Sequence, residues 1–119
     1  MSNQEHYNRL ESMYQAAPIN EFFEPSLTVS EGESVIEMEL SEKFTHAGGG
    51  AHGAVYFKML DDAAYFAANS LEHEVFMLTT SFTTYITRPV SEGKMRAVGK
   101  VVNKNKSQFI AEAIVYDSN

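Results

Sequence analysis

A glycine-rich turn that leads directly into a long apolar helix constrains this chain more than any other feature. The turn reads Gly48-Gly49-Gly50-Ala51-His52-Gly53, and the helical pattern that follows continues to Ser70. One broad face of this helix carries small and apolar side chains, which predicts that it packs inside the molecule against another layer. The face comprises Tyr56, Met59, Leu60, Ala63, Ala64 and Ala67.

Two adjacent carboxylates on this helix have different predicted surroundings. Asp62 falls on the opposite face with Asn69 and with Lys58, four residues earlier, so we expect a solvated acid that pairs with the lysine. Asp61 instead has small apolar neighbours on the helical wheel. An unpaired carboxylate there is costly, which favours a functional role; the alternative is a structural bond to a backbone amide of another segment. The neighbours are Ala54, Phe57, Ala64 and Ala68.

The turn predicts a site for negative charge. Glycine permits close backbone approach, and the first turn of a helix offers unpaired N–H groups that carry a partial positive charge. Such groups suit an anion, or a carbonyl oxygen that gains charge during a reaction. A nucleotide-binding P-loop is excluded because no Gly-Lys-Ser/Thr follows the glycines. A tight loop without a ligand is the alternative.

Length and composition indicate one globular domain. The 119 residues suffice for one core and not for two. The absence of cysteine excludes disulfides and thiolate chemistry and fits a reducing compartment. The N-terminal segment MSNQEHYNRLESMY is polar, and no stretch is long enough to span a membrane, so we expect a cytoplasmic protein. A net charge of −7 argues against nucleic-acid binding.

Basic residues gather in one part of the chain. Residues 1–87 carry 3 basic and 13 acidic groups, whereas 88–106 carry 6 basic groups and a single acidic one. This segment would suit a small polyanionic ligand, although ordinary solubilising charge on the outer face of strands explains it equally well. The basic residues are Arg88, Lys94, Arg96, Lys100, Lys104 and Lys106.

The remaining patterns predict an α+β fold in which the central helix packs against a curled antiparallel sheet. Residues 5–17 form an amphipathic helix that ends at Pro18, and residues 20–25 form a linker. Strands at 26–30 and 33–40 make a hairpin around Glu31-Gly32. Three further strands follow the central helix at 75–88, 94–103 and 108–116. We assign residues 1–25 to an N-terminal helix and linker and residues 26–119 to the main domain.

The acid–base groups near the helix leave three kinds of chemistry to weigh. A Ser-His-Asp hydrolase is disfavoured because the chain has no Gly-x-Ser-x-Gly motif. A metal site is disfavoured because its candidate ligands, His46 and His52, lie on either side of a flexible turn and share no helical face. General acid–base chemistry remains, and its candidate groups are His46, His52, Asp61 and Asp62, with Thr79, Thr80 and Ser81 on the next strand.

The spacing of His52 and Asp61 limits how they can cooperate. Nine residues along one helix separate them by about 13.5 Å and point them roughly 180° apart. They cannot act on one small reacting group within a single chain. If both serve one site, a symmetric dimer with its helices side by side would bring them together and create two equal sites.

These motifs together resemble the hotdog-fold acyl-CoA thioesterases of the PaaI-like group. The resemblance rests on Gly-x-His-Gly at 50–53, Asp61 nine residues after the histidine, Leu78-Thr79-Thr80-Ser81-Phe82 and Ile86-Thr87-Arg88-Pro89. It covers residues 26–117. It implies a long helix wrapped by an antiparallel sheet, an obligate homodimer or homotetramer, and two active sites at the interface, with no metal or organic cofactor.

The resemblance also implies roles for individual residues. The Gly53 N–H polarises the thioester carbonyl, and Asp61 of the other subunit acts as general base or nucleophile. Thr79 orients the attacking water, and His52 sets the loop and the carbonyl. The substrate would be an acyl-CoA or related thioester. Its candidate contacts are His46, Gly50, Ala54 and Ser81, with Arg88, Lys94, Arg96, Lys104 and Lys106 for the CoA phosphates.

The chain differs from the family pattern in three places. His46 stands where the family usually has asparagine, and Ala54 replaces a second glycine. The family usually has one more strand after 108–116, so we expect an unpaired edge there. Two alternative functions stay open: a non-catalytic acyl-CoA-binding module, and an enoyl-thioester hydratase or dehydratase with His52 as base.

Overall fold

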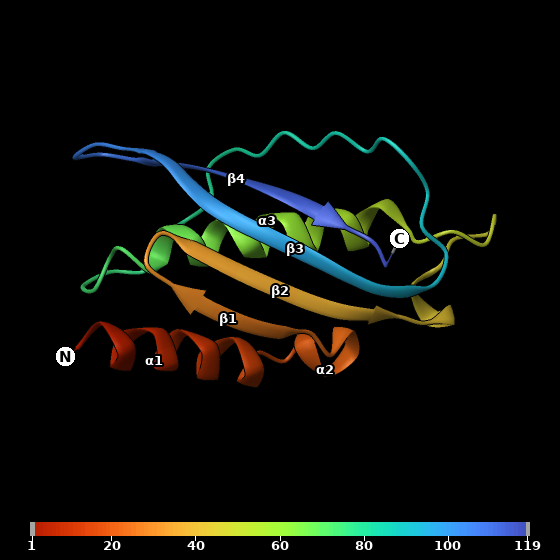
Figure 1. Ribbon diagram of the computed structural model, residues 1–119, viewed down its shortest axis with the longest axis horizontal. Helices are drawn as coiled ribbons and strands as arrows, with labels where there is room; N and C mark the ends of the chain where they lie inside the picture. The colour runs from red at the N-terminus through yellow and green to blue at the C-terminus, as the bar shows by residue number, and fades with distance from the viewer. Residues whose placement is uncertain (1, 119) are drawn as a thin grey trace.

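The computed structural model describes residues 2–118 and shows a sheet curled around one helix. Helix α3 (Gly53–Asn69) lies behind a four-stranded antiparallel sheet (Figure 1). Helix α1 (Asn3–Ala16) packs beside the edge strand β1. This arrangement confirms the predicted α+β architecture. Among the described residues, no helix is both long enough and apolar enough to cross a membrane.

The sheet follows chain order, β1-β2-β3-β4. Strands β1 (Ser26–Ser30) and β2 (Glu33–Leu40) form the predicted hairpin, where Gly32 takes a φ of 69° that favours glycine. Strands β3 (Gly93–Lys104) and β4 (Phe109–Tyr116) form a second antiparallel pair, with a register shift between Val101 and Asn103. These bounds agree with the sequence prediction to within a residue or two.

The core lies between α3 and the inner face of the sheet. The apolar face of α3 is buried as expected, with Met59 and Ala63 almost fully inaccessible. Backbone meets backbone at one point, because a Cβ atom at Gly99 of β3 would overlap the Ala63 carbonyl group. The Ser34 hydroxyl of β2 donates to that same carbonyl oxygen over 2.6 Å. Helix and sheet are therefore in direct contact at Ala63.

The prediction of a strand at 75–88 is wrong. Residues 75–90, called here the crossing segment, run along α3 from one end of the helix to the other without joining the sheet (Figure 1). Residues 78–89 make no backbone–backbone hydrogen bond to any described residue. The alternation of Phe82, Thr84 and Ile86 favours an extended path but selects no strand partner. Residues 20–25 are also more ordered than a linker, since Asn20–Phe23 form the short helix α2.

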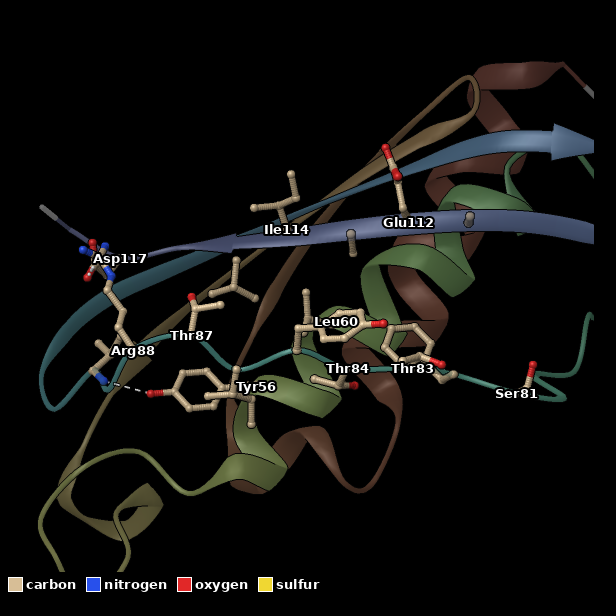
Figure 2. A pocket seen from close by; sticks show the side chains of 17 residues that line it. Tyr56, Leu60, Ser81, Thr83, Thr84, Thr87, Arg88, Glu112, Ile114 and Asp117 are labelled. Carbon is tan, nitrogen blue, oxygen red and sulfur yellow. Dashed lines mark hydrogen bonds and ion pairs between the residues drawn. The ribbon is translucent and has the colours of Figure 1, made fainter.

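The sheet ends at β4, whose outer edge pairs with no other strand of residues 2–118. A groove of about 610 Å³ separates this strand from residues 81–88 of the crossing segment. Figure 2 shows Thr83 and Thr87 of the crossing segment on one side of the groove. Glu112 and Ile114 of β4 lie on the other side, and Leu60 of α3 lies between the segment and the strand. The backbone N–H and C=O groups of β4 and of residues 81–88 therefore form no hydrogen bonds with one another across the groove.

An unpaired strand edge predicts self-association, which a charge on β4 should suppress. Ile114 is 54% exposed, and a lysine on an edge strand opposes pairing with another chain. We expect Ile114→Lys to raise the concentration at which light scattering detects large aggregates. Val102→Lys is the control, because Val102 is 51% exposed on β3, an inner strand. Equal effects of the two lysines would show that the edge is not the cause.

Candidate active site

The turn before α3 is held together by its own backbone and by His46. The His46 N–H donates to the Gly50 carbonyl, and the Gly49 N–H donates back to the His46 carbonyl, each over 2.9 Å. The imidazole Nδ1 of His46 accepts the Gly48 N–H over 2.9 Å. In this chain, His46 therefore shapes the turn that contains Gly50, another predicted substrate contact.

His52 caps the helix that begins at Gly53. Its Nδ1 accepts the Ala54 N–H over 3.0 Å, so the neutral ring carries its proton on Nε2, and the residue is exposed. The Gly53 N–H has no partner among residues 2–118. It lies at the positive end of the α3 dipole, where free N–H groups bind anions and carbonyl oxygens. This end of α3 can therefore stabilise negative charge on an oxygen.

Asp61 and Thr79 are hydrogen-bonded to each other within one chain. The Thr79 hydroxyl donates to Oδ1 of Asp61 over 3.2 Å. Burial, aided by the charge of Asp62, raises the pKa of the Asp61 carboxyl above its usual range, and the Thr79 bond and Lys58 oppose that rise. A carboxylate with a raised pKa is a stronger base than an exposed one. The pair can accept a proton from a water molecule.

The neighbouring Asp62 corrects a sequence prediction. The predicted pair with Lys58 is present at 2.6 Å, but the two side chains are only 13% (Lys58) and 21% (Asp62) exposed. The Tyr14 hydroxyl of α1 also donates to Oδ2 of Asp62, over 2.7 Å. Asn69, expected on the solvent side as well, is buried. Asp62 is therefore a structural acid that joins α1 to α3.

The structure forms two half-sites and leaves them apart within one chain. One consists of Asp61 and Thr79, and the other of the Gly53 N–H with His52. Eight residues of helix separate Gly53 from Asp61 by about 12 Å along the axis. One small reacting group cannot touch both. If both half-sites serve one reaction, a second subunit would have to bring them together.

The predicted substrate contacts are scattered. Ser81 and Arg88 line the groove beside β4, which neither Asp61 nor Gly53 reaches. Arg88 pairs with Asp117 over 2.9 Å at the end of that groove, near the Tyr56 hydroxyl that accepts the Val90 N–H over 2.8 Å (Figure 2).

The basic residues of 88–106 do not form one positive surface. Strand register places Lys94 opposite Glu39 and Arg96 opposite Glu37. These carboxylates, invisible to a count along the chain, offset the positive charge. Lys104 and Lys106 lie where β3 turns into β4, at the far end of the molecule from the glycine turn (Figure 1). Arg88 is the basic residue nearest in sequence to Val90, whose carbonyl accepts the Ala51 N–H of the turn over 2.7 Å.

Sequence reasoning missed two polar residues beside the Asp61–Thr79 pair. Tyr65 and Asn69 both bind the backbone of Met77 in the crossing segment. Their spacing from Asp61, four and eight residues along one helix face, is the signal that could have found them. Among the described residues, no group of three or more His, Asp or Glu side chains could hold a metal ion.

Comparison with known proteins defines the family. Residues 48–119 match the model described as the thioesterase superfamily. The chain therefore belongs to the thioesterase superfamily, and its fold is the hotdog fold of that family, as the sequence resemblance implied.

Curated relatives agree with this assignment. A Thermoplasma volcanium protein named "putative esterase" is 30% identical over 95 residues, which cover 80% of this chain and 71% of that protein. A Saccharolobus solfataricus protein with the same description is 26% identical over 91 residues, or 76% of this chain. The chain spans only 61% of the length of the latter relative.

Solved structures support the fold. The Escherichia coli PaaI protein from the phenylacetic acid degradation operon superposes with a TM-score of 0.87 at 17% identity, covering 98% of this chain and 84% of that one. A thioesterase family protein from Silicibacter pomeroyi gives a TM-score of 0.86 at 22% identity, covering 98% and 85%.

Proposed function

We propose that this chain hydrolyses acyl-CoA or related thioesters at a site completed across a dimer interface. The observation that carries the proposal is the Asp61–Thr79 pair, a half-buried carboxylate with a raised pKa, on a helix whose first N–H has no partner within the described chain. Membership of the thioesterase superfamily supports the reaction class.

The helix start supplies the electrophilic half of the site. The thioester carbonyl oxygen accepts the Gly53 N–H, and the helix dipole stabilises the negative charge that develops there. The Nδ1 atom of His52 accepts the next N–H, that of Ala54, and so leaves the Gly53 N–H to the substrate. The Nε2–H of the exposed His52 is a second donor for the substrate.

The carboxylate of the partner subunit's Asp61 supplies the base. It takes a proton from a water molecule that the partner's Thr79 helps to orient, and the water oxygen forms a bond to the carbonyl carbon. The resulting tetrahedral intermediate breaks its C–S bond and releases the carboxylic acid and a thiolate, which then takes up a proton. The raised pKa of Asp61 makes its carboxylate a stronger base for this step.

A panel of thioesters tests the proposal. The purified chain should release free thiol from at least one of short-chain, long-chain and aromatic acyl-CoA esters, followed with a thiol-reactive dye. Binding of acyl-CoA without thiol release would favour a non-catalytic module. Addition of water to an enoyl-CoA, seen as loss of its ultraviolet absorbance, would favour a hydratase with His52 as base.

CoA binding should weaken with salt. Exposed phosphate contacts are screened over about 10 Å at 0.1 M salt and over about 3 Å at 1 M. We expect calorimetry to show a Kd for CoA that rises roughly tenfold between 50 and 500 mM NaCl. Salt-independent binding would mean that no basic residue of 88–106 contacts the phosphates.

Two alanine variants identify which basic residues take part. Arg88→Ala should weaken CoA binding at low salt, because Arg88 is 63% exposed and lies two residues before Val90, which bonds to the turn that would hold the thioester. Lys100→Ala should not, because strand register places Lys100 between Glu33 and Glu112. The assignment of Lys94, Arg96, Lys104 and Lys106 to the phosphates stays a prediction that the same measurement tests.

A further inference from the structure

Two side chains of α3 hold one peptide unit of the crossing segment from both sides. The Tyr65 hydroxyl donates to the Met77 carbonyl over 2.7 Å. The Met77 N–H donates to Oδ1 of Asn69 over 3.3 Å. The Asn69 amide nitrogen donates to the Tyr65 carbonyl over 2.8 Å, which fixes Oδ1 toward Met77. We call this arrangement the Met77 clamp.

The chemistry of both residues suits a fixed clamp. Asn69 is only 1% exposed, so its amide has no water to exchange with. Burial, together with the nearby charge of Asp61, raises the pKa of the Tyr65 phenol. The hydroxyl therefore keeps its proton and remains a donor to the Met77 carbonyl at any pH at which the protein would work.

The clamp lies in line with Asp61. Asp61, Tyr65 and Asn69 follow one another at four-residue spacing and share a face of α3. One such step along a helix is about 6 Å, and two residues of extended chain span about 6.6 Å. A segment held at Met77 opposite Tyr65 therefore brings Thr79 opposite Asp61, where the 3.2 Å hydrogen bond is found.

Little else fixes this part of the crossing segment. Residues 78–89 have no backbone–backbone hydrogen bond to the rest of residues 2–118. The next backbone anchor along the chain is Val90, held by Tyr56 and Ala51. Between the two anchors lie the ring contact of Phe82 with Phe57 and the ion pair of Arg88. Thr79, two residues from the clamp, is thus located chiefly by it.

We propose that Tyr65 and Asn69 are positioning residues that hold Thr79 against Asp61 through the Met77 peptide. The kinetic part of this inference rests on the proposed thioesterase function. Loss of the clamp leaves Asp61, the Gly53 N–H and the substrate contacts in place. It moves the hydroxyl that orients water, and misplacement by about 1 Å can cost a large factor in rate. The loss therefore falls on kcat and leaves KM unchanged.

A double-mutant cycle tests the route of this effect. We expect Tyr65→Phe and Thr79→Val each to lower kcat about five- to tenfold with KM unchanged. If Tyr65 acts through Thr79, the double variant loses no more than Thr79→Val alone. Tyr14→Phe is the matched control, because it removes a hydroxyl with an equally short 2.7 Å bond, made to Asp62. Multiplicative losses, or equal kcat in the two tyrosine variants, would overturn the proposal.

Amide hydrogen exchange reads the clamp without any activity. We expect exchange of the Met77 N–H, which donates to Asn69, to be faster in Tyr65→Phe than in wild type or Tyr14→Phe, and Asn69→Ala to act in the same direction. Unchanged exchange in both clamp variants would overturn the clamp even in an active enzyme. Faster exchange in a protein that hydrolyses no thioester would refute the proposed function and still support the structural clamp.

Discussion

We expect Asp61→Asn to abolish thioester hydrolysis while making the protein more stable. Loss of a general base lowers kcat by about 10²–10⁴-fold. The stability gain follows from linkage: because the pKa of Asp61 is raised in the folded state, ionisation favours the unfolded chain. Above the usual aspartate pKa that cost is present, and the neutral amide removes it. Thermal melting should therefore show a higher Tm at pH 7, and the gain should vanish near pH 3.

Asp62→Asn should do the opposite. It leaves the Asp61–Thr79 pair intact, so most of the activity remains. The substitution removes the negative charge that pairs with Lys58, and it weakens the hydrogen bond from Tyr14. The free energy of unfolding should fall by about 1–2 kcal/mol. Denaturant unfolding and the thiol-release assay together give the comparison. Equal loss of activity in both variants would contradict the assignment of the base to Asp61.

Mixing two inactive variants should restore activity. Gly53→Pro removes the N–H that polarises the carbonyl, and Asp61→Asn removes the base. Proline is well tolerated at the first helical position, and His52 before it already has the extended ψ of 142° that proline requires. A Cβ atom at Gly53 would meet only Ile86, at 3.5 Å. The variant should therefore fold, which circular dichroism can verify.

The expected recovery follows from symmetry. Each homodimer is inactive because both of its sites lack the same part. In a mixed dimer one site lacks both parts and the other is intact. Unfolding and refolding an equal mixture places half of the chains in mixed dimers, so about a quarter of wild-type activity returns if pairing is random.

A second mixture serves as the control. Asp61 and Thr79 belong to the same half-site, so mixing Asp61→Asn with Thr79→Val leaves every site with one defect. Activity should not exceed the residual rate of Thr79→Val. If well-folded Gly53→Pro and Asp61→Asn chains exchange subunits and no activity returns, the two half-sites do not meet across the interface.

Much of the fold was predictable because its signals are local. The hairpin of β1 and β2 follows from alternation around Glu31-Gly32, and the buried face of α3 follows from helical periodicity. The strand predicted at 75–88 is wrong because its signal, too, is only local. Its alternation indicates an extended chain, but pairing depends on whether β4 lies within hydrogen-bond reach, and the groove shows that it does not.

The candidate site was predictable only where one element defines it. Asp61 stands out on its own helix. Thr79 was one of three hydroxyl residues after that helix, and only the family resemblance gave it a role beside the base. Asp62 could not be judged from the wheel, since Tyr14 reaches it from a helix 48 residues away in sequence. The partners of Arg96 and Lys94 depend in the same way on strand register.

The contact between Gly99 and Ala63 limits which residues this family can carry at position 99. Because α3 carries both the Gly53 amide and the Asp61 carboxylate, any side chain at position 99 would push the helix off the sheet and displace both halves of the site together. No single compensating change on α3 can restore the space, because the obstacle is the main chain of Ala63. In a library of single substitutions scored by growth, codon 99 should be as intolerant as codon 61, although it encodes no reactive group.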